Sequence, residues 1–208
     1  MALVTLRDRT FTAADVMSLE PETRYERCRF DGLALNHLAL DECEFRDCSF
    51  AGASLLGTKL NGAAFFSCNF SNARVGGVNL FDARFEGCKF TGVDFTQGLK
   101  LLGVTFTRCN FELAKLSGLN LSDFRFDGSS FVEADLANCN LTDASFLNCD
   151  LSYVNWEDAR FNDTDLRGAN LSGLDPRRID LRGAVITPAQ ATQLAESLGM
   201  VVVDDTIG

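Results

Sequence analysis

Several residue types on which catalytic and metal sites depend are scarce in this chain of 208 residues. It contains one histidine, His37, and three prolines, and its cysteines form no C-x-x-C pair, the spacing most typical of zinc sites. No apolar run approaches the roughly 18 residues of a membrane-spanning helix, and the charged start MALVTLRDRTF lacks the apolar stretch of a secretory signal. We therefore expect a cytoplasmic protein without a metal, a cofactor or a membrane segment.

Positive charge is also in short supply. The chain carries 29 acidic and 19 basic residues, which gives a net charge of −10 at pH 7. Nucleic acids and anionic membranes attract basic surfaces, so neither is expected as a direct ligand. The charge balance favours a partner protein with a basic surface.

What the chain has in abundance is a repeat of five residues. In the segment ARFEGCKFTGVDF (83–95), Phe85, Phe90 and Phe95 lie five apart, a period that neither an α-helix nor an ordinary strand shows. One extra residue within 96–100 interrupts the repeat, which then resumes. The bulky apolar positions, here called the central residues, are Tyr25 and every fifth residue to Phe95, then Leu101 and every fifth residue to Leu171.

A second period lies on top of the first, because the central residues run Phe, Leu, Leu, Phe and repeat every 20 residues. The residue two places before each central residue is small or medium-sized and uncharged, so two residues of every five face inward. Most of the 17 glycines fall two places after a central residue, where a type II turn needs a positive φ. These patterns predict an all-β solenoid with four walls and a turn at each corner.

All eight cysteines fall in the small inward column: Cys28, Cys43, Cys48, Cys68, Cys88, Cys109, Cys139 and Cys149. Zinc ligation and disulfide bonding are the functional alternatives, but zinc sites usually show close cysteine pairs and disulfides need converging side chains. Side chains stacked in parallel favour thiols that fill space as small apolar groups.

Acidic residues gather in one outward column, which Gly62 and Gly103 interrupt. The column contains Glu42, Asp82, Asp123, Asp143 and Asp163, and further charge on that wall and its neighbours comes from Asp135, Glu157, Asp158 and Asp165. One interpretation is a solvated face that keeps a repeat protein soluble. The other is an anionic stripe that resembles a nucleic-acid backbone at lower charge density.

Phe81 and Leu102 are the anomaly among the outward positions, because both are large and apolar and they lie one coil apart. They predict either a small contact patch or a satellite cluster covered by the loop at 96–100. Catalysis has little support, since His37 projects from a corner without a nucleophilic partner. We expect no enzymatic activity.

The repeat occupies residues 1–186, with an N-terminal cap at 1–22 and a break at 174–178. Residues 187–208 differ: Thr187, Pro188 and Gln190 predict a helix start with a capping box, Gly199 predicts its end, and an apolar strand is expected over 200–203. This terminus is either a simple cap or a homodimer interface, and its apolar content favours the dimer. The expected interface residues are Leu194, Leu198, Met200, Val201, Val202 and Val203.

The segments ADLAN (134–138), CNLTD (139–143), ANLSG (169–173) and CNFSN (68–72) resemble the A(D/N)LxN pattern of pentapeptide-repeat proteins. The resemblance covers 23–173 and implies a right-handed quadrilateral β-helix. With its helical terminus, the chain is similar to the Qnr and mycobacterial fluoroquinolone-resistance (MfpA-like) subgroup, whose members form end-to-end dimers and act on DNA gyrase or topoisomerase IV as DNA mimics. It departs from the Gram-negative Qnr proteins because it lacks their long loops.

The resemblance implies that the acidic column contacts DNA gyrase or topoisomerase IV and that the C-terminus forms a homodimer. The expected function is therefore protection from topoisomerase poisons, or competition with them, without enzymatic activity. The alternative is a structural or interaction module of the same family with a different protein partner.

Overall fold

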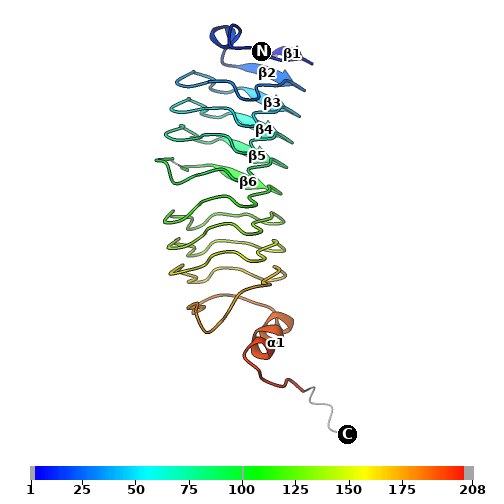
Figure 1. Cartoon of the computed structure of the whole chain (residues 1–208), viewed down its shortest axis with the longest axis vertical. Coiled ribbons are helices and arrows are strands. Elements are labelled where there is room, and N and C mark those ends of the chain that lie inside the picture. The colour runs from blue at the N-terminus through cyan, green and yellow to red at the C-terminus, as the bar shows by residue number, and fades with distance from the viewer. Residues whose placement is uncertain (1–2, 100, 204–208) are drawn as a thin grey trace.

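The computed structural model describes residues 3–99 and 101–203, which form a rod of stacked coils with an α-helix at its C-terminal end (Figure 1). Six short strands lie in one parallel sheet in chain order. The elements are β1 (Val4–Arg7), the 3-10 helix η1 (Val16–Ser18), β2 (Thr23–Glu26), β3 (Glu44–Arg46), β4 (Ala64–Phe66), β5 (Arg84–Glu86), β6 (Thr105–Thr107) and α1 (Pro188–Ser197).

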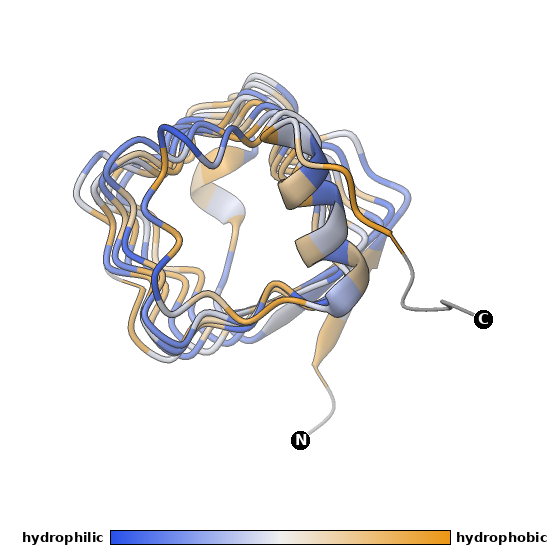
Figure 2. Cartoon of the chain, turned by 90° about the horizontal axis from the view of Figure 1, so that it is seen from below, coloured by the Kyte–Doolittle hydropathy of each residue, from blue (hydrophilic) through white to orange (hydrophobic). Residues whose placement is uncertain are grey.

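The coils have four walls, which we number by their first central residue: wall 1 from Tyr25, wall 2 from Phe30, wall 3 from Leu35 and wall 4 from Leu40. Strands β2 to β6 belong to wall 1, and isolated parallel bridges form the other walls. Seen along the axis, the coils superpose in a four-sided outline (Figure 2). The predicted all-β solenoid is confirmed.

The core is a set of side-chain columns in which like stacks on like. Phe50 lies between Phe30 and Phe70, with ring centroids 4.8 Å apart on both sides and nearly parallel planes. This distance matches the spacing of neighbouring strands, so the backbone repeat itself places the rings at a favourable stacking distance. Neighbouring columns meet edge to face, as Phe45 and Phe50 do at 5.2 Å. The central residues of the described coils therefore fill the interior of the rod.

Most corners are the turns that the glycine positions predict. The Ala53 N–H donates to the Phe50 carbonyl at 2.9 Å, and Gly52 between them has a φ of 65°. The corners that follow β2 to β6 lack this bond. There a cysteine is turned inward and its thiol donates to the coil before it, as Cys48 does to the Tyr25 carbonyl at 3.3 Å.

All eight cysteines are free and buried, as the sequence predicts. Burial raises the pKa of the Cys139 thiol to about 11 and that of Cys149 to about 12. Desolvation also raises the pKa of Cys68, which lies at the corner between walls 1 and 2. The thiols of Cys68, Cys139 and Cys149 are therefore neutral at physiological pH. All eight thiols are buried and serve as packing groups.

The C-terminal helix begins as predicted, but the segment after it differs from the prediction. Thr187 is the N-cap of α1, and the Gln190 Oε1 accepts the Thr187 N–H at 2.9 Å, which completes the capping box. The strand expected over Met200–Val203 is wrong, because these residues carry no strand. They lead away from the coils (Figure 1), and none of them pairs with a strand of the described chain.

Within residues 3–99 and 101–203, no helix has the length and apolar character needed to cross a membrane.

Candidate functional site: an acidic edge

The corner between walls 4 and 1 carries the predicted acidic column. Its residues have φ between 54° and 64°, a left-handed conformation that aspartate tolerates better than most side chains. Asp123 and Asp143 donate their backbone N–H groups to the carbonyls of Thr142 and Asn162 in the following coils, at 3.0 and 2.9 Å. The carboxylates of Asp123, Asp143 and Asp163 therefore project from three successive coils.

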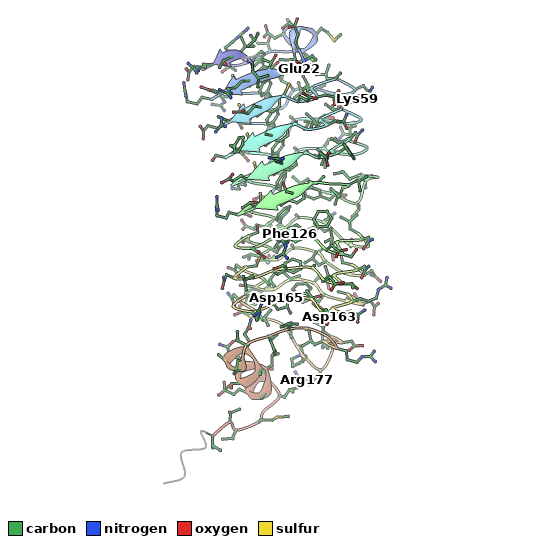
Figure 3. The ribbon with its side chains drawn as sticks, turned by 180° about the vertical axis from the view of Figure 1, so that it is seen from behind. Glu22, Lys59, Phe126, Asp163, Asp165 and Arg177 are labelled. Carbon is green, nitrogen blue, oxygen red and sulfur yellow. The ribbon has the colours of Figure 1, made fainter. Side chains whose placement is uncertain are left out.

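Glu22 also belongs to this corner, although the sequence pattern predicts that residue 22 lies in the N-terminal cap. Its φ is 51° and its N–H donates to the Asp41 carbonyl at 3.0 Å, in the same way that Asp123 and Asp143 donate to their own next coils. Glu22 and Asp163 lie near opposite ends of the coils in Figure 3. We call the set the acidic edge: Glu22, Glu42, Asp82, Asp123, Asp143 and Asp163.

None of the acidic-edge carboxylates forms an ion pair within the part of the chain that the structure describes. Acidic residues elsewhere do: Glu26 pairs with Arg7 at 2.6 Å, and Asp175 pairs with Arg177 at 2.9 Å. Each of these pairs neutralises its carboxylate, whereas the acidic edge keeps its charge exposed to solvent. Its negative potential is therefore available to a basic partner.

The other four predicted contact residues do not join this edge. Asp135 and Asp165 precede a central residue, and each accepts the backbone N–H two places on, from Ala137 at 3.2 Å and Arg167 at 3.0 Å. The Arg167 guanidinium also pairs with Asp165 and holds the pKa of that carboxyl below its ordinary value. These two carboxylates stabilise corners. Glu157 and Asp158 are exposed at a different corner, between walls 3 and 4.

Phe81 and Leu102 lie beside the acidic edge on the outer face of wall 4. Their side chains are 46% and 69% exposed, so the alternative in which the neighbouring loop covers them is wrong. The Asp82 N–H donates to the Leu102 carbonyl at 3.1 Å, which places the two apolar side chains on successive coils. An apolar pair next to unpaired carboxylates suits a partner surface that is both basic and apolar.

Two surface grooves beside the acidic edge coincide with breaks in the hydrogen-bond ladder between coils. A groove of about 440 Å³ runs between 101–107 and 122–125, and one of about 430 Å³ runs between 159–162 and 180–182. No backbone hydrogen bonds join the two sides of either groove in the described chain. Sequence reasoning located the insertion at 96–100 but gave no sign of these openings.

The residues usually needed for chemistry are dispersed. His37 occupies a corner, where its imidazole lies against Gly57, and the thiols are all buried. Over the described ranges, no three His, Cys, Asp or Glu residues are grouped so that they could hold a metal ion.

The C-terminal end presents an apolar surface. Leu194 of α1 packs partly against the core. Gln190, also in α1, is buried between the helix and the last coils, where its side-chain amide donates to the Leu166 and Ala169 carbonyls at 2.7 and 2.8 Å. The remaining apolar side chains of this end are exposed: Leu198, Met200, Val201, Val202 and Val203.

The described residues form a four-sided β-solenoid with an acidic edge and a core of stacked side chains. The sequence matches the family described as Pentapeptide repeat region over residues 22–95 and 99–186. The chain therefore belongs to the pentapeptide-repeat family, and its fold is the family's right-handed quadrilateral β-helix.

Solved structures agree with this assignment. A trypsin-treated variant of QnrB1, a plasmid-mediated fluoroquinolone resistance protein, has 24% identity and a TM-score of 0.67, covering 97% of this chain and 98% of its own. HetL, involved in heterocyst differentiation regulation in the cyanobacterium Nostoc, has 24% identity and a TM-score of 0.53, covering 88% and 86%. At these identities the likeness establishes the fold. A search among curated proteins finds no match.

Proposed function

We propose that this chain is a non-enzymatic DNA mimic that binds DNA gyrase or topoisomerase IV, and that it protects the enzyme from topoisomerase poisons or competes with them. The acidic edge carries the proposal, because it is a linear array of unpaired carboxylates on a rigid rod. A surface that normally binds the DNA backbone attracts such an array by the same electrostatic force. Gyrase presents such a surface in the cytoplasm, where we place this protein.

The acidic edge mimics DNA only in part, because its charge density is lower than that of the DNA backbone. Coils follow one another at about 4.8 Å, and each contributes at most one carboxylate to the edge. Duplex DNA carries one charge per about 1.7 Å of its axis. The apolar pair Phe81 and Leu102 is therefore assigned a second role in binding, since it adds contact area where charge alone is sparse.

We assign the exposed C-terminal residues to a homodimer interface. Leu198 and Met200–Val203 form an apolar surface larger than the end of one coil needs as a cover. An isologous contact between two such ends would double the length of the rod and extend the acidic edge on both sides of the junction.

A supercoiling assay tests the function. The purified protein is titrated into gyrase from the source organism, with and without a fluoroquinolone. Rescue of the poisoned enzyme would establish protection, whereas inhibition without rescue would indicate competition with DNA. No effect in either arm would contradict the proposal.

A different protein partner is the second candidate, and one observation favours it. Arg125 follows Asp123 by two residues on the adjoining wall, so the negative edge has a basic neighbour. A partner other than gyrase that carries both signs of charge would suit this surface. Affinity capture with the intact protein, repeated with the acidic edge neutralised, separates the two candidates by the identity of the protein that is lost.

A further inference from the structure

We propose that the solenoid has a mouth between residues 101–108 and 120–127, on walls 4 and 1, and that this mouth accepts an extended segment of the partner protein. The inference rests on the proposed function, because gyrase is the partner in question. It adds a mode of contact, backbone pairing, to the charge attraction described above.

The mouth is defined by the backbone groups on its two sides, which we call the upper lip (residues 101–108) and the lower lip (residues 120–127). In an intact part of the ladder, the Phe126 N–H donates to the Ser145 carbonyl of the next coil at 2.8 Å. The Phe106 N–H, one coil earlier in the same column, has no hydrogen-bond partner among the described residues, and the same holds for Gly103 and Arg108. On the lower lip, the Arg125 N–H also has no hydrogen-bond partner among the described residues.

Walls 2 and 3 of the same two coils are closed. The Phe111 N–H donates to the Ser130 carbonyl at 2.7 Å, and the Leu116 N–H donates to the Asp135 carbonyl at 2.9 Å. Among the described residues, backbone hydrogen bonds therefore join the two coils along walls 2 and 3 and are missing along walls 4 and 1, where the Phe106 and Phe126 rings still stack at 5.9 Å. This arrangement resembles a hinge, in which further opening of walls 4 and 1 breaks no backbone hydrogen bond.

Phe124 supplies a physical reason for the opening. It occupies the inward column in which the other residues are small or medium-sized, and it is only partly buried. Its ring stacks on Phe126 at 5.6 Å, and the rings of Phe106 and Phe126 are 5.9 Å apart, compared with 4.8 Å between Phe45 and Phe65 in the same wall. We attribute the wider spacing of the coils at this point to the oversized Phe124 side chain. Figure 3 shows Phe126 just beyond β6, at the lower lip.

The chemistry of the lips identifies the occupant. Both lips offer N–H and C=O groups in alternation, as the edges of strands do, and a peptide backbone satisfies both kinds of group together. A bound cation would leave the N–H groups unpaired, and an anion would leave the carbonyls unpaired. The groove of about 440 Å³ is lined by Val104 and Phe106 on one side and by Phe124 on the other, so it also offers apolar contacts.

The surroundings of the mouth define the sequence of the segment that would fit. Asp123 lines the groove and the carboxylate of Asp82 overhangs Gly103 at its upper lip. Leu102, which is largely exposed, lies on the same lip. We therefore expect an extended segment of gyrase that carries a basic side chain toward the acidic edge and an apolar side chain toward Leu102.

Amide hydrogen exchange of the full-length protein, free and saturated with gyrase, tests the inference. In the free protein, peptides that contain Gly103, Phe106, Arg108 and Arg125 should exchange fast, whereas those that contain Phe111 and Leu116 should exchange slowly. Gyrase should slow exchange at both lips at least tenfold. A complex that forms while the lips still exchange fast would overturn the inference and leave the proposed function standing. Failure to form any complex would overturn both.

A reversible staple gives a second test. Thr105→Cys combined with Arg125→Cys places one thiol on each lip, and a short cross-linker that joins both thiols through reducible disulfides should hold the mouth closed. The matched control is Asn110→Cys with Ser130→Cys, a pair already bridged on wall 2. We expect the cross-linked mouth variant to bind gyrase at least tenfold more weakly, reduction of the cross-link to restore binding, and the cross-linked control to bind as before. Undiminished affinity with the mouth stapled would overturn the inference.

Discussion

The carboxylate of Asp82 occupies the space that a side chain at position 103, on the following coil, would need. Gly103 also has a φ of 72°, so two constraints select glycine at this point of the acidic edge. The glycine that interrupts the acidic column at residue 103 is therefore needed there, because the absence of a side chain leaves room for the Asp82 carboxylate of the preceding coil.

Gly103→Ala should combine a backbone penalty with displacement of the Asp82 carboxylate. We expect a loss of about 1–2 kcal/mol in the free energy of unfolding from the left-handed conformation, and weaker gyrase inhibition in the supercoiling assay. Gly118→Ala is the matched control, since its φ is 74° and a Cβ there would meet nothing within 4 Å. It should show the same loss of stability in urea denaturation and unchanged inhibition. Equal inhibition by the two variants would contradict the role given to Asp82.

Neutralising Asp123, Asp143 and Asp163 to asparagine should weaken gyrase inhibition by tenfold or more. Asparagine tolerates the left-handed conformation as well as aspartate does, and removing three like charges in a row relieves their repulsion, so the melting temperature should not fall. The control removes the same amount of charge elsewhere, through Asp47→Asn, Glu112→Gln and Glu133→Gln. If both triple variants inhibit gyrase equally, net charge rather than the acidic edge is responsible.

Gln190→Met should undock α1. The variant leaves the Leu166 and Ala169 carbonyls without their donor, and each buried unsatisfied group costs about 1–3 kcal/mol. We expect faster proteolysis near residue 187 and weaker self-association in sedimentation velocity. Gln193→Met, at a more accessible position of the same helix, should change neither. Normal self-association of the Gln190 variant would remove α1 from the proposed dimer interface.

The buried thiols should make the protein sensitive to alkali. Burial raises the pKa of Cys139 to about 11 and that of Cys149 to about 12 from an ordinary 9.0, so the fold binds these protons more tightly than the unfolded chain does. Their stabilising contribution is complete below pH 9 and is lost as the pH rises toward 11–12.

The melting temperature measured from pH 8 to pH 11 should therefore fall above pH 9. Cys139→Ser with Cys149→Ser should reduce that fall, because serine already occupies the equivalent inward position at Ser129 and does not titrate in this range. A wild-type melting temperature that stays constant to pH 11 would contradict this account.

Much of the architecture could be predicted from local patterns. Each pentapeptide repeats the same alternation of central residue, corner and small inward residue, so the positions of Phe50, Gly52 and Ala53 report their environments without reference to the rest of the chain. The burial of all eight cysteines followed from the same column, and the capping box of Thr187 and Gln190 is a strictly local signal.

The candidate site was less accessible to this reasoning. The column of Asp123, Asp143 and Asp163 is visible because a regular coil converts a fixed interval into a straight edge. Sequence spacing could not show that those carboxylates are unpaired while that of Asp165 is not. The Asp165 carboxylate accepts hydrogen bonds from the Arg167 guanidinium and from the Arg167 backbone N–H, and only the structure shows these contacts. Glu22 was missed because its pentapeptide precedes the first recognised central residue.

The amino-acid sequence by itself determined the four-walled coil, the contents of its core and the line of acidic residues, because stacking like on like makes each coil a copy of its neighbour. Only the tertiary structure decided where that copying fails. The ladder opens beside Phe124 and the segment Met200–Val203 forms no strand, since both outcomes depend on how whole coils tilt and on which strand edges lie within reach.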